Sequence, residues 1–184
     1  MSFELLSIKN KLEVLEVMQV KKLIILRGNS GSGKTTVAKE LQQLFGRNTM
    51  LISQDVIRRD ILHVRDGKNT LALPLLTELL KYENTNCDIV ILEGILNSTR
   101  YRPLFESAVK TYEYNVFDYY FDIPFEETVK RHYSRSQRSE FDEVDMRRWW
   151  KEKDYSDVLN EIIITKEKDK DSIVEEIYNL VSDR

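Results

Sequence analysis

The sequence is poor in the residues that build disulfides and zinc sites. Its 184 residues include one cysteine, Cys87, and two histidines. One cysteine cannot form a disulfide within the chain, and no group of cysteines and histidines has the spacing of a metal site. These absences exclude a disulfide-stabilised scaffold and favour a reducing compartment, so we expect a cytoplasmic protein.

Long uncharged runs are also missing. No stretch approaches the roughly eighteen apolar residues of a membrane span, and acids and lysines are scattered where a signal peptide would have a basic start and an apolar block. The formal net charge of −3 argues against a surface that binds nucleic acid over its whole extent. We therefore expect one domain spanning residues 1–184, with no membrane partner.

Only three prolines and six glycines interrupt the chain, and regular patterns fill the rest. β-rich runs lie at residues 22–27, 49–53, 88–92, 115–121 and 161–165. Helical patterns lie at residues 3–18, 34–45, 55–63, 75–83, 124–133, 142–151 and 171–182. Strands that alternate with helices predict an α/β fold, in which right-handed crossovers build a mostly parallel sheet covered on both faces.

Three of the glycines fall within six residues of one loop, in the stretch GNSGSGKTT. The spacing Gly28-x-x-x-x-Gly33-Lys34-Thr35 is the P-loop pattern, and it stands between an apolar strand and an amphipathic helix as its mechanism requires. Successive N–H groups of such a loop point at phosphate oxygens, and the helix N-terminus adds a positive dipole end. Lys34 is expected to reach the β- and γ-phosphates, and the Thr35 hydroxyl to ligate Mg²⁺. The alternative is a glycine-rich connection that binds nothing, and the strand and helix around the loop argue against it.

The loop therefore predicts a nucleoside triphosphate, taken to be ATP, together with Mg²⁺. The residues expected to contact the nucleotide are Gly28, Asn29, Ser30, Gly31, Ser32, Gly33, Lys34, Thr35 and Thr36. The third strand ends at Glu93, at the carboxyl edge where open α/β sheets bind ligands. Its carboxylate can hold a water of the Mg²⁺ shell and border the substrate, or it is an ordinary acidic residue at a strand end.

The second strand leads into the stretch SQDVIRRD, residues 53–60. If strand 2 lies at the sheet edge beyond strand 3, this tip faces the γ-phosphate across the cleft. Asp55 would then accept a proton from a substrate hydroxyl, and Arg58, one helical turn later on the same face, would hold a polar or anionic acceptor group. Asp55 can also serve simply as the N-cap of a helix over 55–63, and the two roles are compatible.

A third polar stretch, KRHYSRSQRSEF, covers residues 130–141. Arg131, Arg135 and Arg138 are spaced i, i+4, i+7, so on a continuous helix they would share one face. The serines and polar neighbours suggest a movable lid over residues 131–143, whose arginines would close on the transferring phosphoryl group and exclude water. A solvated basic helix end is the alternative.

With these residues the chain resembles the P-loop kinases of the nucleoside-monophosphate-kinase type, over residues 22–182. The motifs RGNSGSGKTT, Asp55-x-x-Arg58, Glu93-Gly94 and Arg131-x-x-x-Arg135 resemble the branch of polynucleotide 5′-kinases, zeta toxins and chloramphenicol phosphotransferases. The resemblance implies a three-layer P-loop NTPase fold whose five-stranded parallel sheet has the order 2-3-1-4-5, with a short lid between strands 4 and 5. It also implies that Arg131 lies against the adenine and the phosphates, and that Arg135 reaches the transferred phosphate.

The predicted function is an ATP- and Mg²⁺-dependent kinase that transfers the γ-phosphate to a hydroxyl. Catalysis is assigned to Lys34, Asp55, Arg131 and Arg135, acceptor binding to Asp55, Arg58, Glu93 and Arg138, and metal binding to Thr35 and Glu93. The acceptor stays open among a nucleoside, a nucleic-acid 5′ end and another small molecule. The alternative is a nucleotide-binding ATPase or switch without an acceptor, which the missing guanine motif Asn/Thr-Lys-x-Asp and the chain's own lid arginines disfavour.

Overall fold

A computed structural model describes residues 21–134 and 142–183, and its centre is one parallel β-sheet. The strands are β1 (Lys22–Gly28), β2 (Thr49–Ser53), β3 (Ile89–Gly94), β4 (Val116–Phe121) and β5 (Ile162–Ile164). Their order across the sheet is β2-β3-β1-β4-β5, which confirms the predicted arrangement. The helix expected at residues 3–18 and most of the expected lid lie outside the described residues.

The helices follow the predicted pattern with two corrections. Their bounds are α2 (Lys34–Phe45), α3 (Gln54–Val56), α4 (Ala72–Asn86), α5 (Arg102–Tyr112), α6 (Phe125–Tyr133), α7 (Glu143–Trp149) and α8 (Lys170–Ser182), with a π-helix, η1, at Ile57–Ile61 and a 3-10 turn, η2, at Glu113–Asn115. The sequence reading missed α5, although Pro103 marks its start and four apolar residues at helical spacing are buried. The expected helix over 55–63 is instead one short turn followed by the π-helix.

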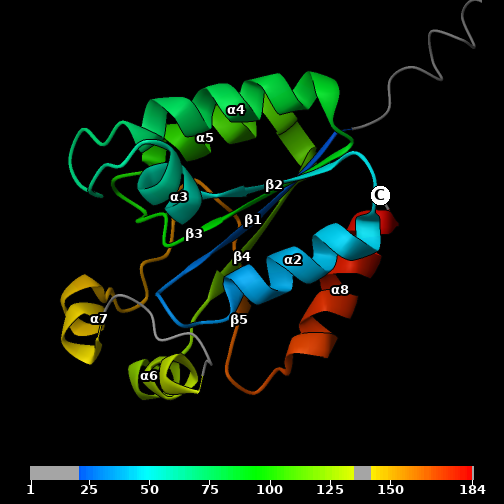
Figure 1. The fold of residues 1–184 in the computed structure, drawn as a ribbon. Coiled ribbons are helices and arrows are strands. Elements are labelled where there is room, and N and C mark those ends of the chain that lie inside the picture. The colour runs from blue at the N-terminus through cyan, green and yellow to red at the C-terminus, as the bar shows by residue number, and fades with distance from the viewer. Residues whose placement is uncertain (1–20, 135–141, 184) are drawn as a thin grey trace, which may run out of the picture.

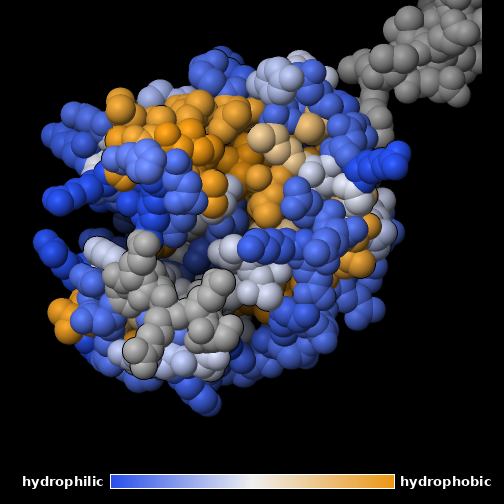
Figure 2. Space-filling view, viewed as in Figure 1, coloured by the Kyte–Doolittle hydropathy of each residue, from blue (hydrophilic) through white to orange (hydrophobic). Residues whose placement is uncertain are grey.

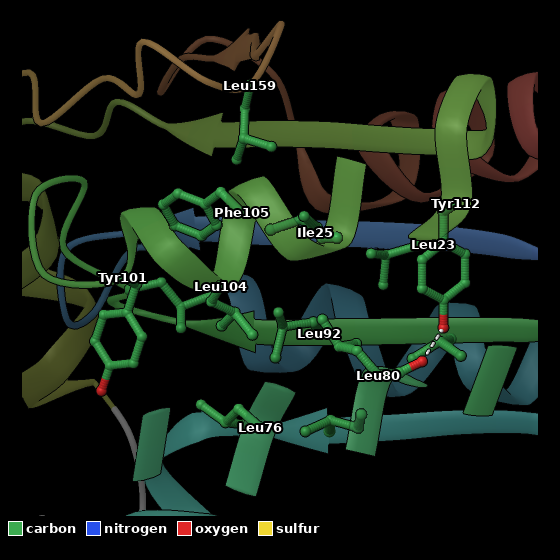
Figure 3. Close-up of a cluster of buried hydrophobic side chains, with 14 of the residues drawn as sticks. Leu23, Ile25, Leu76, Leu80, Leu92, Tyr101, Leu104, Phe105, Tyr112 and Leu159 are labelled. Atoms are coloured by element: carbon green, nitrogen blue, oxygen red, sulfur yellow. Dashed lines mark hydrogen bonds between the residues drawn. The ribbon is translucent and has the colours of Figure 1, made fainter. Parts of the chain in front are cut away.

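Alternation along the strands sends side chains into two separate cores. Leu23 and Ile25 of β1 face the side covered by α4 and α5, whereas Ile24 and Leu26 face the side covered by α2 and α8 (Figure 1). Figure 3 shows side chains of α4 and α5 pointing toward those of β1 and β3. Because Leu23 to Leu26 of β1 are apolar on both faces and the strand is central in the sheet, β1 is buried from Leu23 onward.

The carboxyl ends of the strands meet at one edge of the sheet. The short α3 follows β2 at this edge, and α6 and α7 gather beside it (Figure 1). The crossover helices α2, α4 and α5 and the C-terminal helix α8 lie on the two faces, so the loops at this edge are left open for a site. Among the described helices, none is long and apolar enough to cross a membrane.

Candidate active site

The loop between β1 and α2 has the backbone of a phosphate cradle. Gly28, Gly31 and Gly33 have φ angles of 140°, 80° and 105°, which side chains of L-residues rarely permit. A Cβ at Gly28 would lie 2.7 Å from the carbonyl oxygen of Phe121, and one at Gly31 would lie 2.7 Å from that of Thr128. The loop can therefore turn tightly against β4 and α6 only because glycines occupy these positions.

Lys34 is buried at the start of α2 and lies over the loop. Its Nζ donates to the carbonyl oxygen of Asn29 at 2.8 Å and to the hydroxyl of Ser32 at 3.1 Å. Arg131, from α6, donates through Nη1 to the carbonyl oxygen of Ser32 at 3.1 Å, while its Nε pairs with Glu127 at 2.9 Å. Two cations thus lie against one loop whose amides and helix end already favour an anion.

A hydroxyl and a carboxylate meet beside this loop. Thr35 donates through Oγ1 to Glu93 Oε2 at 3.0 Å, and Ser53 donates to the other oxygen of the same carboxylate. Glu93 is buried at the end of β3, so only its carboxylate edge reaches the site. This pair of hard oxygen donors fits the Mg²⁺ that the fold family implies, because Mg²⁺ keeps several waters and takes few protein ligands besides phosphate oxygens.

Asp55 of α3 and Arg58 of η1 lie side by side just after β2. Arg58 Nη2 is 2.8 Å from Asp55 Oδ1, and Arg59 Nε is 3.6 Å from the same oxygen. The expected N-cap role of Asp55 is wrong, because the helix begins at Gln54 and Ser53 occupies the cap position. The half-exposed Asp55 carboxylate instead pairs with Arg58 and Arg59, and Asp55 lines the cleft.

A cleft of about 630 Å³ joins these groups to the P-loop. Its lining residues are Ser30, Gln54, Asp55, Arg58, Arg59, Arg65, Asp66, Ile95, Asn97, Arg100, Arg148, Trp149 and Lys151. Figure 2 shows hydrophilic side chains bordering the hollow at this end, between the side of α3 and that of α7. Ser30 places the cleft against the phosphate loop, and Asp55 and Arg58 line the same cleft.

The site therefore unites most of the predicted residues and separates one. Glu93 does not line the cleft, so its contacts fit a metal-side role and not the predicted substrate contact. Arg135 and Arg138 lie outside the described residues, and with them the arginine face predicted for the lid. Trp149, for which the sequence analysis offered no role, lines the cleft with 40% of its surface exposed.

The segments beneath the site are held together by Arg27, a residue that the sequence analysis did not single out. This fully buried side chain donates to the carbonyl oxygen of Leu96 at 3.2 Å and pairs with Asp154 at 3.1 Å and Glu161 at 2.6 Å. Burial raises the pKa of Glu161, and the charge of Arg27 opposes that rise. Arg27 thereby connects the loop after β3 to the segment after α7. The sequence did contain a signal for this role, because Arg27 is a lone charged residue near the end of an otherwise apolar run.

Asn29 makes a second connection to the segment after α7. Its side-chain amide donates to the carbonyl oxygen of Lys151 at 2.6 Å and accepts from the Lys151 backbone N–H at 3.0 Å. Asn29 was predicted as a nucleotide contact, but its side chain is engaged in this pair, which leaves only its backbone for phosphate. The P-loop and the wall of the cleft that carries Arg148 and Lys151 are thus joined directly.

The chain belongs to the family described as "AAA domain", whose model matches residues 23–159, more than half of the sequence. No curated protein matches the sequence significantly. The matched span begins in β1 and ends just before β5, so it contains the P-loop, Asp55, Glu93 and Arg131.

Solved structures share the fold at low identity. A protein named APE1195 is 18% identical with a TM-score of 0.65, over 90% of this chain and 97% of its own. A gluconokinase from Sinorhizobium meliloti 1021 is 12% identical with a TM-score of 0.61, over 89% and 93%. Shikimate kinase from Acinetobacter baumannii, in complex with shikimate, is 20% identical with a TM-score of 0.58, over 91% and 97%. At these identities the likeness establishes the P-loop fold.

Proposed function

We propose that the protein is an ATP- and Mg²⁺-dependent kinase that transfers the γ-phosphate to a hydroxyl of an acceptor bound in the cleft. The observation that carries the proposal is that one cleft is lined both by Ser30 of the P-loop and by Asp55 with Arg58. A nucleotide switch needs no acceptor and therefore no residues such as Asp55 and Arg58 placed to bind one. Two of the structural neighbours are named as kinases of small hydroxylated acids, which supports the same class of reaction.

The nucleotide side would act through fixed charge. The loop amides and Lys34 would hold the phosphates, and Arg131 would lie near them from α6. Thr35 and Glu93 would hold Mg²⁺, which neutralises charge on the phosphates when bound. The engagement of Lys34 with Asn29 and Ser32 keeps its ammonium over the loop before nucleotide arrives.

The acceptor side would orient the attacking group. The acceptor oxygen forms a bond to the γ-phosphorus, the bond from that phosphorus to the β–γ bridging oxygen breaks, and ADP leaves. The hydroxyl proton passes to the Asp55 carboxylate, whose position Arg58 and Arg59 maintain. The motif Asp55-x-x-Arg58 supports placing the chain in the branch of polynucleotide 5′-kinases, zeta toxins and chloramphenicol phosphotransferases.

The test is an acceptor screen with γ-labelled ATP. Wild-type protein and Lys34→Ala are incubated with nucleosides, 5′-hydroxyl oligonucleotides, sugars and sugar acids, and transferred label is separated from released phosphate. Transfer to one acceptor class by the wild type and not by the variant supports the kinase. Release of phosphate alone, unaffected by every acceptor, would replace it with an ATPase or switch.

A further inference from the structure

The acceptor cleft is far more cationic than the chain as a whole. Its lining includes six cationic and two acidic side chains, an excess of four positive charges, in a chain whose formal net charge is −3. The cations are Arg58, Arg59, Arg65, Arg100, Arg148 and Lys151. They come from η1, the loop before α4, the loop after β3, and α7 with the segment after it, so the fold alone gathers them.

The two acids that line the cleft pair with only half of these cations. Asp55 pairs with Arg58 and Arg59, and Asp66 pairs with Arg100 at 2.7 Å. Across the described residues no carboxylate lies within ion-pair distance of the last three cations, which are Arg65, Arg148 and Lys151. All three are exposed, so a ligand can reach them from the cleft. Like charges that converge on one cavity favour an anion there.

A buried amide in the same cleft points to a second feature of the ligand. Gln54 donates through Nε2 to the hydroxyl of Tyr101 at 2.9 Å, and that hydroxyl lies 3.0 Å from Asp66 Oδ1. Burial raises the pKa of Tyr101, so the hydroxyl keeps its proton and donates it to the carboxylate. Because Tyr101 can only accept from Gln54, the direction of the chain fixes the amide nitrogen on Tyr101.

The oxygen of Gln54 is therefore left as a hydrogen-bond acceptor. This Oε1 is buried and has no partner among the described residues, although Gln54 is only 1% exposed and lines the cleft. A buried acceptor without a donor carries a cost of about 1–3 kcal/mol. A ligand hydroxyl that reached the floor of the cleft would remove that cost.

We infer that the acceptor is a small hydroxylated anion, a carboxylate or a phosphate monoester. Its anionic group is held by Arg65, Arg148 and Lys151, and one of its hydroxyls donates to Gln54 Oε1. The inference rests on the proposed kinase function, since it concerns the acceptor of the same site. The cleft volume of about 630 Å³ suits a small molecule and not a nucleic-acid strand.

The first experiment measures binding, with the P-loop saturated by a non-hydrolysable ATP analogue and Mg²⁺. Calorimetry compares glycerate with glycerol, and ribose 5-phosphate with ribose, so that each pair differs in charge and the two anions separate carboxylate from phosphate. At least one anion should bind at millimolar concentration, at least about tenfold more tightly than its neutral partner. Arg65→Gln and Arg148→Gln should each weaken that anion about three- to tenfold, whereas Arg47→Gln, at the opposite end of the sheet, should not.

The second experiment tests the amide with anions that lack hydroxyls. Wild-type protein should prefer glycerate to propionate and ribose 5-phosphate to methyl phosphate. Gln54→Met keeps a similar volume and leaves Tyr101 bonded to Asp66, so it should abolish that preference while the melting temperature stays close to that of the wild type.

Three results would overturn the inference. One is equal affinity for charged and neutral partners, or no binding of any charged probe at millimolar concentration. Another is a hydroxyl preference that survives Gln54→Met, and the third is a 5′-hydroxyl trinucleotide that binds more tightly than every small anion. Transfer of label without any preference for charged acceptors would support the kinase function and reject the anionic acceptor. Anion binding without any transfer would support the anion site and reject the kinase function.

Discussion

The nucleotide side and the acceptor side of this site are built from different materials. The proposed nucleotide side centres on one continuous stretch, Gly28 to Thr36, whose backbone amides and three positive-φ glycines form the phosphate loop, and Glu93 and Arg131 add to it from outside. The proposed acceptor side is a set of side chains from four separate segments, residues 54–59, 65–66, 95–100 and 148–151, that meet only in the folded protein. A local motif thus defines the first, and tertiary contacts define the second.

This difference separates phosphate binding, which many proteins share, from recognition of one particular acceptor. Phosphates look alike to a backbone cradle, so one loop can serve many enzymes. The acceptor cleft must instead discriminate among hydroxyl compounds, which requires side chains of specific charge and polarity. The connections through Arg27 and Asn29 make the two sides one structural unit.

The largest expected effect tests whether the acceptor side depends on those buried connections. Arg27→Met leaves the buried carboxylate of Glu161 and the partly buried carboxylate of Asp154 without their cation, so we expect a loss of about 3–5 kcal/mol in the free energy of unfolding. Chemical denaturation measures it. Arg102→Met, which removes exposed pairs with Glu106 and Asp157, should cost less than about 1 kcal/mol. Equal losses in the two variants would show that burial of the Arg27 network is unimportant.

The second prediction separates the nucleotide side from the acceptor side. Lys34→Ala should lower transfer about 10²- to 10³-fold, because a fixed donor to the transferring phosphate is removed. Label transfer to the best acceptor from the screen measures it. Lys39→Ala, exposed on the same helix, should transfer normally. Wild-type transfer by Lys34→Ala would reject the P-loop as the working half of the site.

The third prediction makes the converse change on the acceptor side. Asp55→Asn should lower transfer about 10²-fold, at the low end for loss of a general base, since phosphoryl transfer needs little early proton removal. ATP affinity, measured by calorimetry, should be unchanged because Lys34, Thr35 and the loop amides are untouched. Asp60→Asn, an exposed acid of η1, is the control and should behave as wild type. Loss of ATP affinity in step with transfer would move Asp55 to the nucleotide side.

The smallest effect lies outside both sides, in the middle of β4. Burial raises the pKa of Asp118 from an ordinary 3.8 to about 6, with the neighbouring Glu161 contributing. A carboxyl group whose pKa is higher in the folded than in the unfolded protein favours folding only while it is protonated. The free energy of unfolding should therefore fall as pH rises from about 4 through about 6. Asp118→Asn should therefore be more stable than wild type by up to about 2 kcal/mol near pH 8, with little difference near pH 4.

Denaturation curves at the two pH values measure this difference. Glu113→Gln, an exposed acid close by at the start of η2, should show no such pH dependence. Transfer by Asp118→Asn should stay at the wild-type level at every pH, because Asp118 touches neither the P-loop nor the cleft. A gain in stability that is the same at both pH values would assign it to packing and not to charge.

The sequence by itself determined the parts of this protein that depend on neighbours along the chain. Alternating strand and helix patterns predicted the α/β fold, and the P-loop spacing predicted the residues around Lys34. The sheet order came from the resemblance to the P-loop kinases that these motifs carry. Asp55 and Arg58 were paired correctly because they lie three residues apart on a helical turn. The alternative N-cap role of Asp55 was wrong, because the helix begins one residue earlier, at Gln54, and Ser53 occupies the cap position.

Only the tertiary structure decided how the acceptor cleft is composed. Gln54 and Tyr101 are 47 residues apart, and Asn29 and Lys151 are 122 residues apart, so no local pattern links them. The cations of the cleft are scattered along a chain whose net charge is negative, and their excess exists only where the fold brings their segments together. Backbone geometry follows local sequence, whereas the convergence of side chains depends on how distant segments pack. The acceptor preference that we propose for this protein rests on that convergence.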